Sequence, residues 1–226
     1  MKNWLFILCA FLPALILGQD FKFPKVVQSN QKKGTLRIAN TKEAWHTNIQ
    51  YMGKYQDTIS LNDNTDSIIH SNLMPYELAK KYYYNDRFSA FIHLADTLID
   101  IFIDTSQILT FLSSPYNKKR VYRNSYQAYP VILRNNSDSF AVIGFGNDSP
   151  VLIEALDIDN VWKFITCELE YRCGTGLRNI YLKAGSVVCL LIPKFKGNFK
   201  TKLRLKFNNI VSNTFSGHIN RSQFYN

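Results

Sequence analysis

The sequence has few of the residues from which catalytic and metal centres are built. Its 226 residues include only four His and four Cys, and the His residues are scattered along the chain. The CxxC spacing typical of a zinc site does not occur, and neither does the dense DxDxDG pattern of a calcium loop. We therefore expect no metal and no cofactor, and the sequence leaves open whether the protein is an enzyme.

Glycine and proline are also scarce, with ten and seven residues, which excludes collagen-like and low-complexity chains. Hydrophobic residues make up 46% of the chain and aromatic residues 14%. This is enough to form a core and to exclude wholesale disorder. The length fits one large or two small domains.

Acidic residues are outnumbered, with 17 Asp and Glu against 27 Lys and Arg. The formal net charge is +10 and the sequence pI is near 9.4. A charge of this sign and size favours association with anionic partners.

Residues 1–18 have the layout of a secretory signal peptide. Lys2 supplies a positive charge, Trp4–Leu17 is uncharged and apolar, and Gly18 is a small residue at the expected cleavage site. An uncleaved N-terminal anchor is the alternative. No later segment is as long and apolar as the about 20 residues that a membrane span needs. We expect an exported protein that is soluble in the periplasm or outside the cell.

Three cysteines would remain after cleavage: Cys167, Cys173 and Cys189. An odd number cannot pair completely within one chain, although an exported protein can hold disulfides. All three fall on expected apolar strand faces, which favours buried thiols or one disulfide, with Cys173–Cys189 as the preferred pair. A catalytic cysteine needs a base, and no His lies near Cys173 in sequence.

Residues 19–115 are expected to form a smaller β-rich region with one short helix. The helix is predicted at Pro75–Tyr84, because Pro75 suits the first helical position and Glu77 and Lys81 are spaced i, i+4. The polar, basic stretch Ser113–Arg123 is the expected connection to the next domain. Alternation and turn residues predict strands at Thr35–Ala39, Ala44–Met52, Tyr55–Leu61, Phe88–Leu94 and Thr97–Ile103.

Residues 116–210 are expected to form an antiparallel β-sandwich, followed by a C-terminal tail at 211–226. Short strands at close spacing, with turn residues between them, are typical of this architecture. The expected strands before the last hairpin are Val131–Arg134, Phe140–Phe145, Val151–Leu156 and Ile165–Cys173.

The last hairpin is predicted from Val187 to Phe207, with its turn at Gly197-Asn198. Odd-numbered positions are mostly apolar and are expected to be buried. A shift of one residue would bury every cation, so the register is strongly determined. Six basic residues hold the even positions: Lys194, Lys196, Lys200, Lys202, Arg204 and Lys206.

These six cations, which would form two rows on the hairpin face, are the strongest candidate for a binding surface. Their spacing suits a polyanion such as a charged glycan, lipopolysaccharide or nucleic acid. Nucleic acid is disfavoured by the expected export and by the lack of aromatic residues on this face of the hairpin. The alternative is a solvated outer face, on which Lys prevents edge-to-edge aggregation and Glu168 and Glu170 neutralise part of the charge.

Asp96, Asp100 and Asp104 recur at a spacing of four. On a strand they would line one face. Paired carboxylates are the groups that glycoside hydrolases use, so a glycan-acting hydrolase is an alternative function.

From Trp162 onward the chain resembles uncharacterised exported Ig-like β-sandwich proteins of Gram-negative bacteria. The likeness spans roughly Tyr129 to Phe207. It implies the fold and export, and it implies no catalytic residue. The residues that carry it are Trp162, Cys173-Gly174-Thr175-Gly176, Ile180, Leu182, Gly185, Pro193, Gly197 and Thr201-Lys202-Leu203-Arg204.

The sequence thus predicts an all-β protein, with an antiparallel Ig-like sandwich and a smaller β-rich N-terminal region containing one short helix. The predicted function is that of an exported, non-enzymatic binding module whose basic sheet face meets an anionic envelope polymer or a partner protein. A glycan-acting hydrolase and a subunit of an envelope or secretion assembly are the alternatives.

Overall fold

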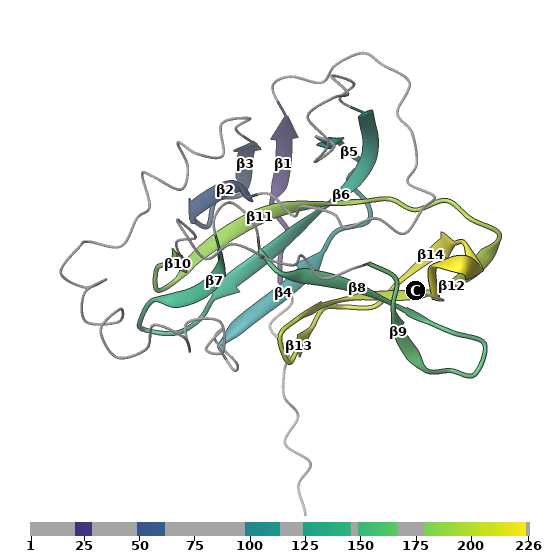
Figure 1. The fold of residues 1–226 in the computed structure, drawn as a ribbon. Coiled ribbons are helices and arrows are strands. Elements are labelled where there is room, and N and C mark those ends of the chain that lie inside the picture. The colour runs from purple at the N-terminus through teal and green to yellow at the C-terminus, as the bar shows by residue number, and fades with distance from the viewer. Residues whose placement is uncertain are drawn as a thin grey trace, which may run out of the picture.

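The computed structural model describes residues 21–28, 49–61, 98–113, 124–145, 149–166 and 179–224. These residues form 14 β-strands and one short 3-10 helix, η1 (Arg221–Phe224), and no α-helix occurs among them (Figure 1). An all-β architecture is therefore confirmed for this part of the chain. The helix expected at Pro75–Tyr84 and the strands expected at Thr35–Ala39 and Phe88–Leu94 lie outside the described residues.

Five strands form the first antiparallel sheet, called sheet 1 here. In order across the sheet they are β2 (Ile49–Lys54), β11 (Ser186–Pro193), β6 (Asn124–Asn135) and β4 (Ile99–Ile103), and β5 (Leu109–Ser113) pairs with the first half of β6. The length of β6 lets β4 and β5 follow one another along the same strand.

Five further strands form the second antiparallel sheet, sheet 2. Its central strand β12 (Phe199–Phe207) pairs on one side with β8 (Val151–Leu156), which in turn pairs with β9 (Trp162–Phe164). On its other side β12 pairs with β14 (Phe215–Ile219) at its start and β13 (Ile210–Val211) at its end.

Two small pairs of strands complete the described fold. Strands β1 (Lys25–Gln28) and β3 (Thr58–Leu61) pair in parallel, and β7 (Ala141–Phe145) and β10 (Asn179–Leu182) pair antiparallel.

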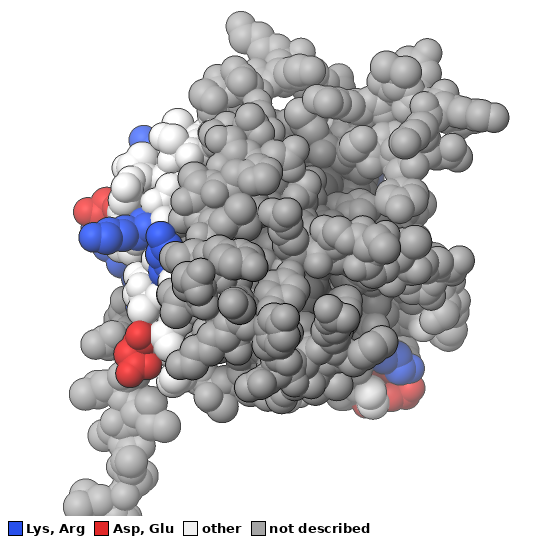
Figure 2. Space-filling view, turned by 60° about the vertical axis from the view of Figure 1, so that its left-hand side comes forward, with Lys and Arg blue, Asp and Glu red and all other residues white. Residues whose placement is uncertain are grey.

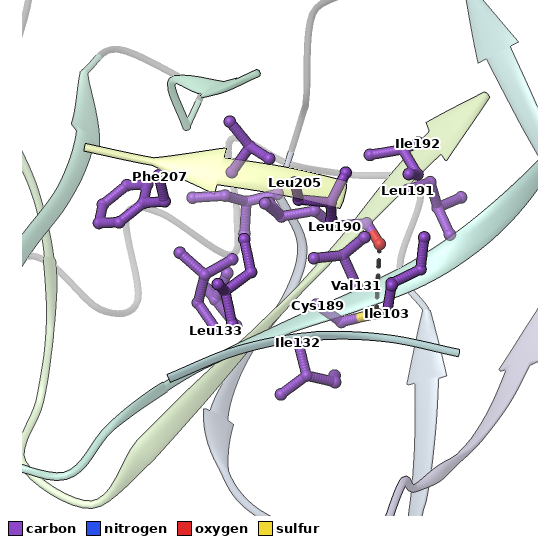
Figure 3. Close-up of a cluster of buried hydrophobic side chains, with 14 of the residues drawn as sticks. Ile103, Val131, Ile132, Leu133, Cys189, Leu190, Leu191, Ile192, Leu205 and Phe207 are labelled. Carbon is purple, nitrogen blue, oxygen red and sulfur yellow. Dashed lines mark hydrogen bonds between the residues drawn. The ribbon is translucent and has the colours of Figure 1, made fainter. Parts of the chain in front are cut away.

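The two large sheets share one hydrophobic core. Leu205 and Phe207 of β12 lie against side chains of β6 and β11, including Leu133 and Leu190 (Figure 3). Asn213 ties the sheets together at the edge: the Ile103 backbone N–H donates to its Oδ1 at 2.9 Å, and its Nδ2 donates to Ile103 O at 3.0 Å. This amide takes the place of a strand neighbour for β4.

Strand β11 is buried along its whole length, not on one face only. The alternation predicts that only its odd-numbered residues are buried, but Val188, Leu190 and Ile192 are also 1% exposed or less. The neighbours β2 and β6 pair with the edges of β11, so its full burial means that both faces of sheet 1 are covered at this strand. Its continuous apolar run is typical of a strand that is covered on both sides.

The predicted hairpin between Val187 and Phe207 is wrong. Strand β11 pairs with β2 and β6 in sheet 1, whereas β12 pairs with β8, β13 and β14 in sheet 2. Residues 194–198 carry the chain from one sheet to the other. Period-two alternation identifies the buried face of a strand, but it does not identify the strand's neighbours.

Sheet 1 combines strands from both sides of the expected domain boundary at 115–116. β2 and β4 cover the outer sides of β11 and β6. Residues 211–226, expected to form a tail, contribute β14 to sheet 2 and the helix η1. Among the described residues, no helix has the length and hydrophobicity to cross a membrane.

Gly197 allows the passage between the sheets, because a Cβ there would overlap with the backbone of Ile219 and Asn220. We expect Gly197→Ala to lower the free energy of unfolding by about 3 kcal/mol, since backbone atoms have to move. The neighbouring Lys196→Ala is the control and should change it by less than about 0.5 kcal/mol. Chemical denaturation measures both, and equal stability of the two variants would contradict the close approach.

Candidate binding face

Strand β12 turns four basic side chains to the outer side of sheet 2. Leu203, Leu205 and Phe207 are buried, while Lys200 and Lys202 are exposed. The alternation predicted along this strand is therefore confirmed. We call the four residues on the outer side the basic face: Lys200, Lys202, Arg204 and Lys206.

Lys194 and Lys196 do not continue this row, because they lie in the passage between the sheets and not on β12. Lys194 is half-buried, and its Nζ lies 5.8 Å from the centre of the Tyr129 ring. Lys196 is exposed. The structure thus brings together four of the six expected cations on one strand.

Aromatic rings accompany the basic face, contrary to the sequence analysis. The Arg204 guanidinium lies 4.2 Å from the centre of the Trp162 ring, and Lys206 Nζ lies 5.3 Å from the centre of the Phe164 ring. Such contacts stabilise by about 0.5–1 kcal/mol each at exposed sites. The rings come from β9, beyond β8, so they could not be found by examining β12 and its expected hairpin partner.

A buried carboxylate neutralises the centre of the basic face. Glu154 of β8 lies opposite Arg204 in the strand register, and Arg204 Nε donates to Glu154 Oε2 at 2.6 Å. Glu154 is only 4% exposed, and a buried charge of this kind needs a partner. Glu154 is not among the residues predicted from the sequence, although an acidic residue inside the apolar run Val151–Leu156 is a signal for a buried pair. Glu168 and Glu170, the expected neutralising residues, lie outside the described residues.

Lys200 and Lys202 keep their charge available for a ligand. Among the described residues, none forms an ion pair with either of them. Residues on one face of a strand repeat about every 6.6–6.8 Å, so the two ammonium groups have a regular spacing along β12. Two other described cations, Lys22 and Arg134, are paired: Lys22 with Asp57 at 2.8 Å and Arg134 with Asp100 at 2.6 Å. On the side shown in Figure 2, described acidic and basic side chains lie beside one another.

A cavity of about 70 Å³ opens between the sheets, with Tyr129, Lys194 and His218 in its wall. It is mainly lined by apolar side chains and has room for a few water molecules. A sugar ring or a polymer chain does not fit, so the cavity is not the binding site that the basic face suggests.

The carboxylates proposed for hydrolysis have structural partners. Asp100 accepts hydrogen bonds from Arg134 Nη2 and Asn136 Nδ2, both at 2.6 Å. Partial burial acts to raise the pKa of Asp104, but hydrogen bonds from Ser106 and Gln107 outweigh it and hold this pKa below its ordinary value. Asp96 lies outside the described residues.

Cys189 is a free, fully buried thiol in β11. Its Sγ donates to Leu190 O at 3.7 Å, and burial raises its pKa to about 12. It is therefore protonated and unreactive at neutral pH. Cys167 and Cys173 lie outside the described residues. The predicted pairing of Cys173 with Cys189 conflicts with the free Cys189 thiol of this structure, and the labelling experiment described below distinguishes the two. The described residues contain no cluster of side chains that would hold a metal ion.

Comparison of the chain with family models, curated proteins and solved structures found no match. The resemblance to exported Ig-like proteins stays a prediction. Lys200 and Lys202, on the strand whose Arg204 and Lys206 contact the rings of β9, are the described residues from which a function can be proposed.

The ion pair between Arg204 and Glu154 is expected to be structural. Arg204→Met leaves a buried, unpaired carboxylate and should lower the free energy of unfolding by about 3 kcal/mol. Adding Glu154→Met should recover most of the loss, because no buried charge remains. Denaturant titration of the wild type, both single variants and the double variant measures the coupling. Additive losses would contradict a direct pair.

The Cys189 thiol is expected to resist alkylation in the folded protein at pH 8 and to react once the protein is denatured. Mass spectrometry of the labelled peptides measures this, and a lack of labelling in denaturant until reduction would show a disulfide instead.

Because the pKa of the Cys189 thiol in the folded protein is raised from 9.0 to about 12, the thiol's contribution to stability is complete below pH 9. It is lost as the pH rises towards 12. Cys189→Val should remove this part of the alkaline loss.

Proposed function

We propose that the protein is an exported, non-enzymatic binding module that binds an anionic polymer of the cell envelope through its basic face. The observation that carries the proposal is the position of Lys200 and Lys202: both are exposed on one strand, and no described acidic residue pairs with them. Export is supported by the signal-peptide layout of residues 1–18.

The physical basis is the exchange of counterions. A polyanion holds condensed cations, and protein ammonium groups release them on binding, which makes the affinity dependent on salt. Lys206 extends the row towards the far end of β12 and rests on the Phe164 ring. Arg204 contributes less, because Glu154 already compensates its charge.

The order of the strands supports an immunoglobulin-like sandwich for the scaffold. Sheet 1 contains β4 and β5, then β6, then β11 and finally β2, which precedes the other strands of the sheet in the chain and is left out of this comparison; sheet 2 contains β14, β12, β8 and β9. If β6 is strand B and β8 is strand C, this order corresponds to A-B-E in one sheet and G-F-C-C′ in the other. Sandwiches of this kind often serve as binding modules, but fold alone does not fix a function.

The alternatives differ in what they require. A glycan-acting hydrolase requires a pair of free carboxylates, and Asp100 and Asp104 are held by hydrogen bonds within the protein. A subunit of an envelope or secretion assembly would copurify with a stoichiometric partner. Neither alternative is favoured by a described residue.

A triple variant of the basic face tests the proposal. Lys200→Ala, Lys202→Ala and Lys206→Ala together should weaken binding to purified lipopolysaccharide and dextran sulfate. The slope of log affinity against log salt should fall by about 1 for each lost contact. Binding is measured by calorimetry at several salt concentrations.

The matched control removes three exposed lysines elsewhere: Lys25→Ala, Lys54→Ala and Lys183→Ala. Its net charge equals that of the test variant, so any difference between the two reports the position of the charges. Equal binding by both triple variants would contradict a specific basic face, as would a wild type that binds neither polymer.

A further inference from the structure

The turn between β8 and β9 exposes apolar side chains at a projecting point of the molecule. Ile158 is 72% exposed and Val161 is 50% exposed. Figure 1 shows the loop between these strands extending away from the body of the two sheets. We call residues 157–161 the β8–β9 tip. Apolar side chains exposed to this extent gain free energy when a partner removes them from water.

The tip is held in one conformation by Asp157. Its carboxylate accepts hydrogen bonds from the backbone N–H groups of Asp159 and Val161, both at 2.9 Å, and pairs with Lys163 Nζ at 2.6 Å. The Asp157 backbone N–H donates to Val161 O at 2.9 Å, and Asn160 adopts a left-handed φ of 60°. The backbone N–H groups of Asp157, Asp159, Asn160 and Val161 are therefore bonded within the turn, which lowers the cost of removing the turn from water.

Cations surround the tip at the same end of sheet 2. The register of β12 against β8 ends at Leu203 and Ala155, so Lys200 and Lys202 lie at the end of β12 that is next to the tip. Asp159 is the one exposed acidic residue of the turn itself, since Asp157 is buried against Lys163. The balance of charge at this end of the sheet is positive.

We propose that the β8–β9 tip inserts Ile158 and Val161 into an anionic lipid surface, while Lys200 and Lys202 contact the phosphate headgroups. Apolar residues at a convex point with basic residues behind them match the layering of a membrane interface, where the hydrocarbon lies below the charged headgroups. A specific protein interface would need about 1,200 Å² or more of complementary surface, which two side chains on a projecting turn do not supply.

This inference goes beyond the proposed function, because the tip is not part of the basic face and its occupant is a lipid surface, not a soluble polymer. The two share Lys200 and Lys202. They are distinguishable with dextran sulfate, because this soluble polyanion has no apolar phase into which Ile158 could insert.

Cosedimentation with vesicles tests the inference. The full mature chain should bind vesicles of phosphatidylglycerol and phosphatidylcholine, and it should bind pure phosphatidylcholine only weakly. Ile158→Ser should weaken binding to the anionic vesicles by about tenfold, from the lost burial of apolar surface. Lys202→Ala should weaken it by about fivefold. Ile158→Trp should strengthen it, because Trp prefers the interface.

Val211→Ser is the matched control. Val211 is 44% exposed and lies in the same sheet, paired with Lys206 at the opposite end of β12. This variant should bind vesicles as the wild type does, and all variants should keep the circular dichroism and melting temperature of the wild type.

Three results would overturn the inference. One is a wild type that does not bind anionic vesicles. Another is loss of binding in Lys202→Ala but not in Ile158→Ser, which would indicate binding by charge alone and leave the proposed function standing. The third is a concentration-dependent dimer that Ile158→Ser abolishes, which would identify a second copy of the chain as the occupant. Loss of vesicle binding in Ile158→Ser, with unchanged binding to dextran sulfate, would support insertion.

Discussion

One face of β12 has to be buried and the other has to remain in solvent, and the arrangement of sheet 2 depends on both requirements. Leu203, Leu205 and Phe207 are buried in the core shared with sheet 1, and full burial of side chains of this size is worth about 1.5–3 kcal/mol each. The alternate positions carry cations, whose transfer into the core would cost more than this burial returns. A shift by one residue is therefore excluded, and the register fixes where each lysine lies relative to β8 and β14.

The pair of Glu154 and Arg204 divides the basic face into two unequal parts. It compensates the charge in the middle of β12. Lys206 remains on one side of the pair, in contact with the Phe164 ring. Lys200 and Lys202 remain on the other side, next to the β8–β9 tip. The available positive charge is thus concentrated at the end of sheet 2 that also carries the exposed apolar side chains, and this coincidence connects the proposed polymer binding with the inferred contact with lipid.

The faces of single strands could be predicted from the sequence, whereas the neighbours of each strand could not. The alternation along β12 identified its exposed and buried faces, because the polarity of each side chain indicates whether it faces solvent or the core. The pairing of β11 with β2 and β6 depends on residues far away in the chain, and the expected hairpin was wrong for that reason. For the same reason, the other residues of the candidate site could not be predicted. Glu154, Trp162 and Phe164 reach the basic face only through the pairing of β12 with β8 and of β8 with β9. The residue types of Asp157–Asn160 favour a turn, but the exposure of Ile158 depends on where the hairpin projects from the fold.

Sheet 1 explains why the N-terminal strands are needed by the C-terminal half. Strand β11 is buried on both faces along its whole length, so both faces need cover from other parts of the fold, and both of its edges are paired, with β2 and with β6. The pairing of Lys54 with Ser186 and of Ile103 with Val131 places β2 and β4 at the two sides of the β11–β6 pair. A C-terminal fragment that begins after β5 would leave both of those strand edges open, and open edges of apolar strands promote aggregation. Because β2 and β11 are far apart in the chain, sheet 1 is complete only when both of these distant segments are present. Strand pairing over such a separation in sequence is slow. The binding surface of sheet 2 therefore depends, through the shared core, on strands from the opposite end of the sequence.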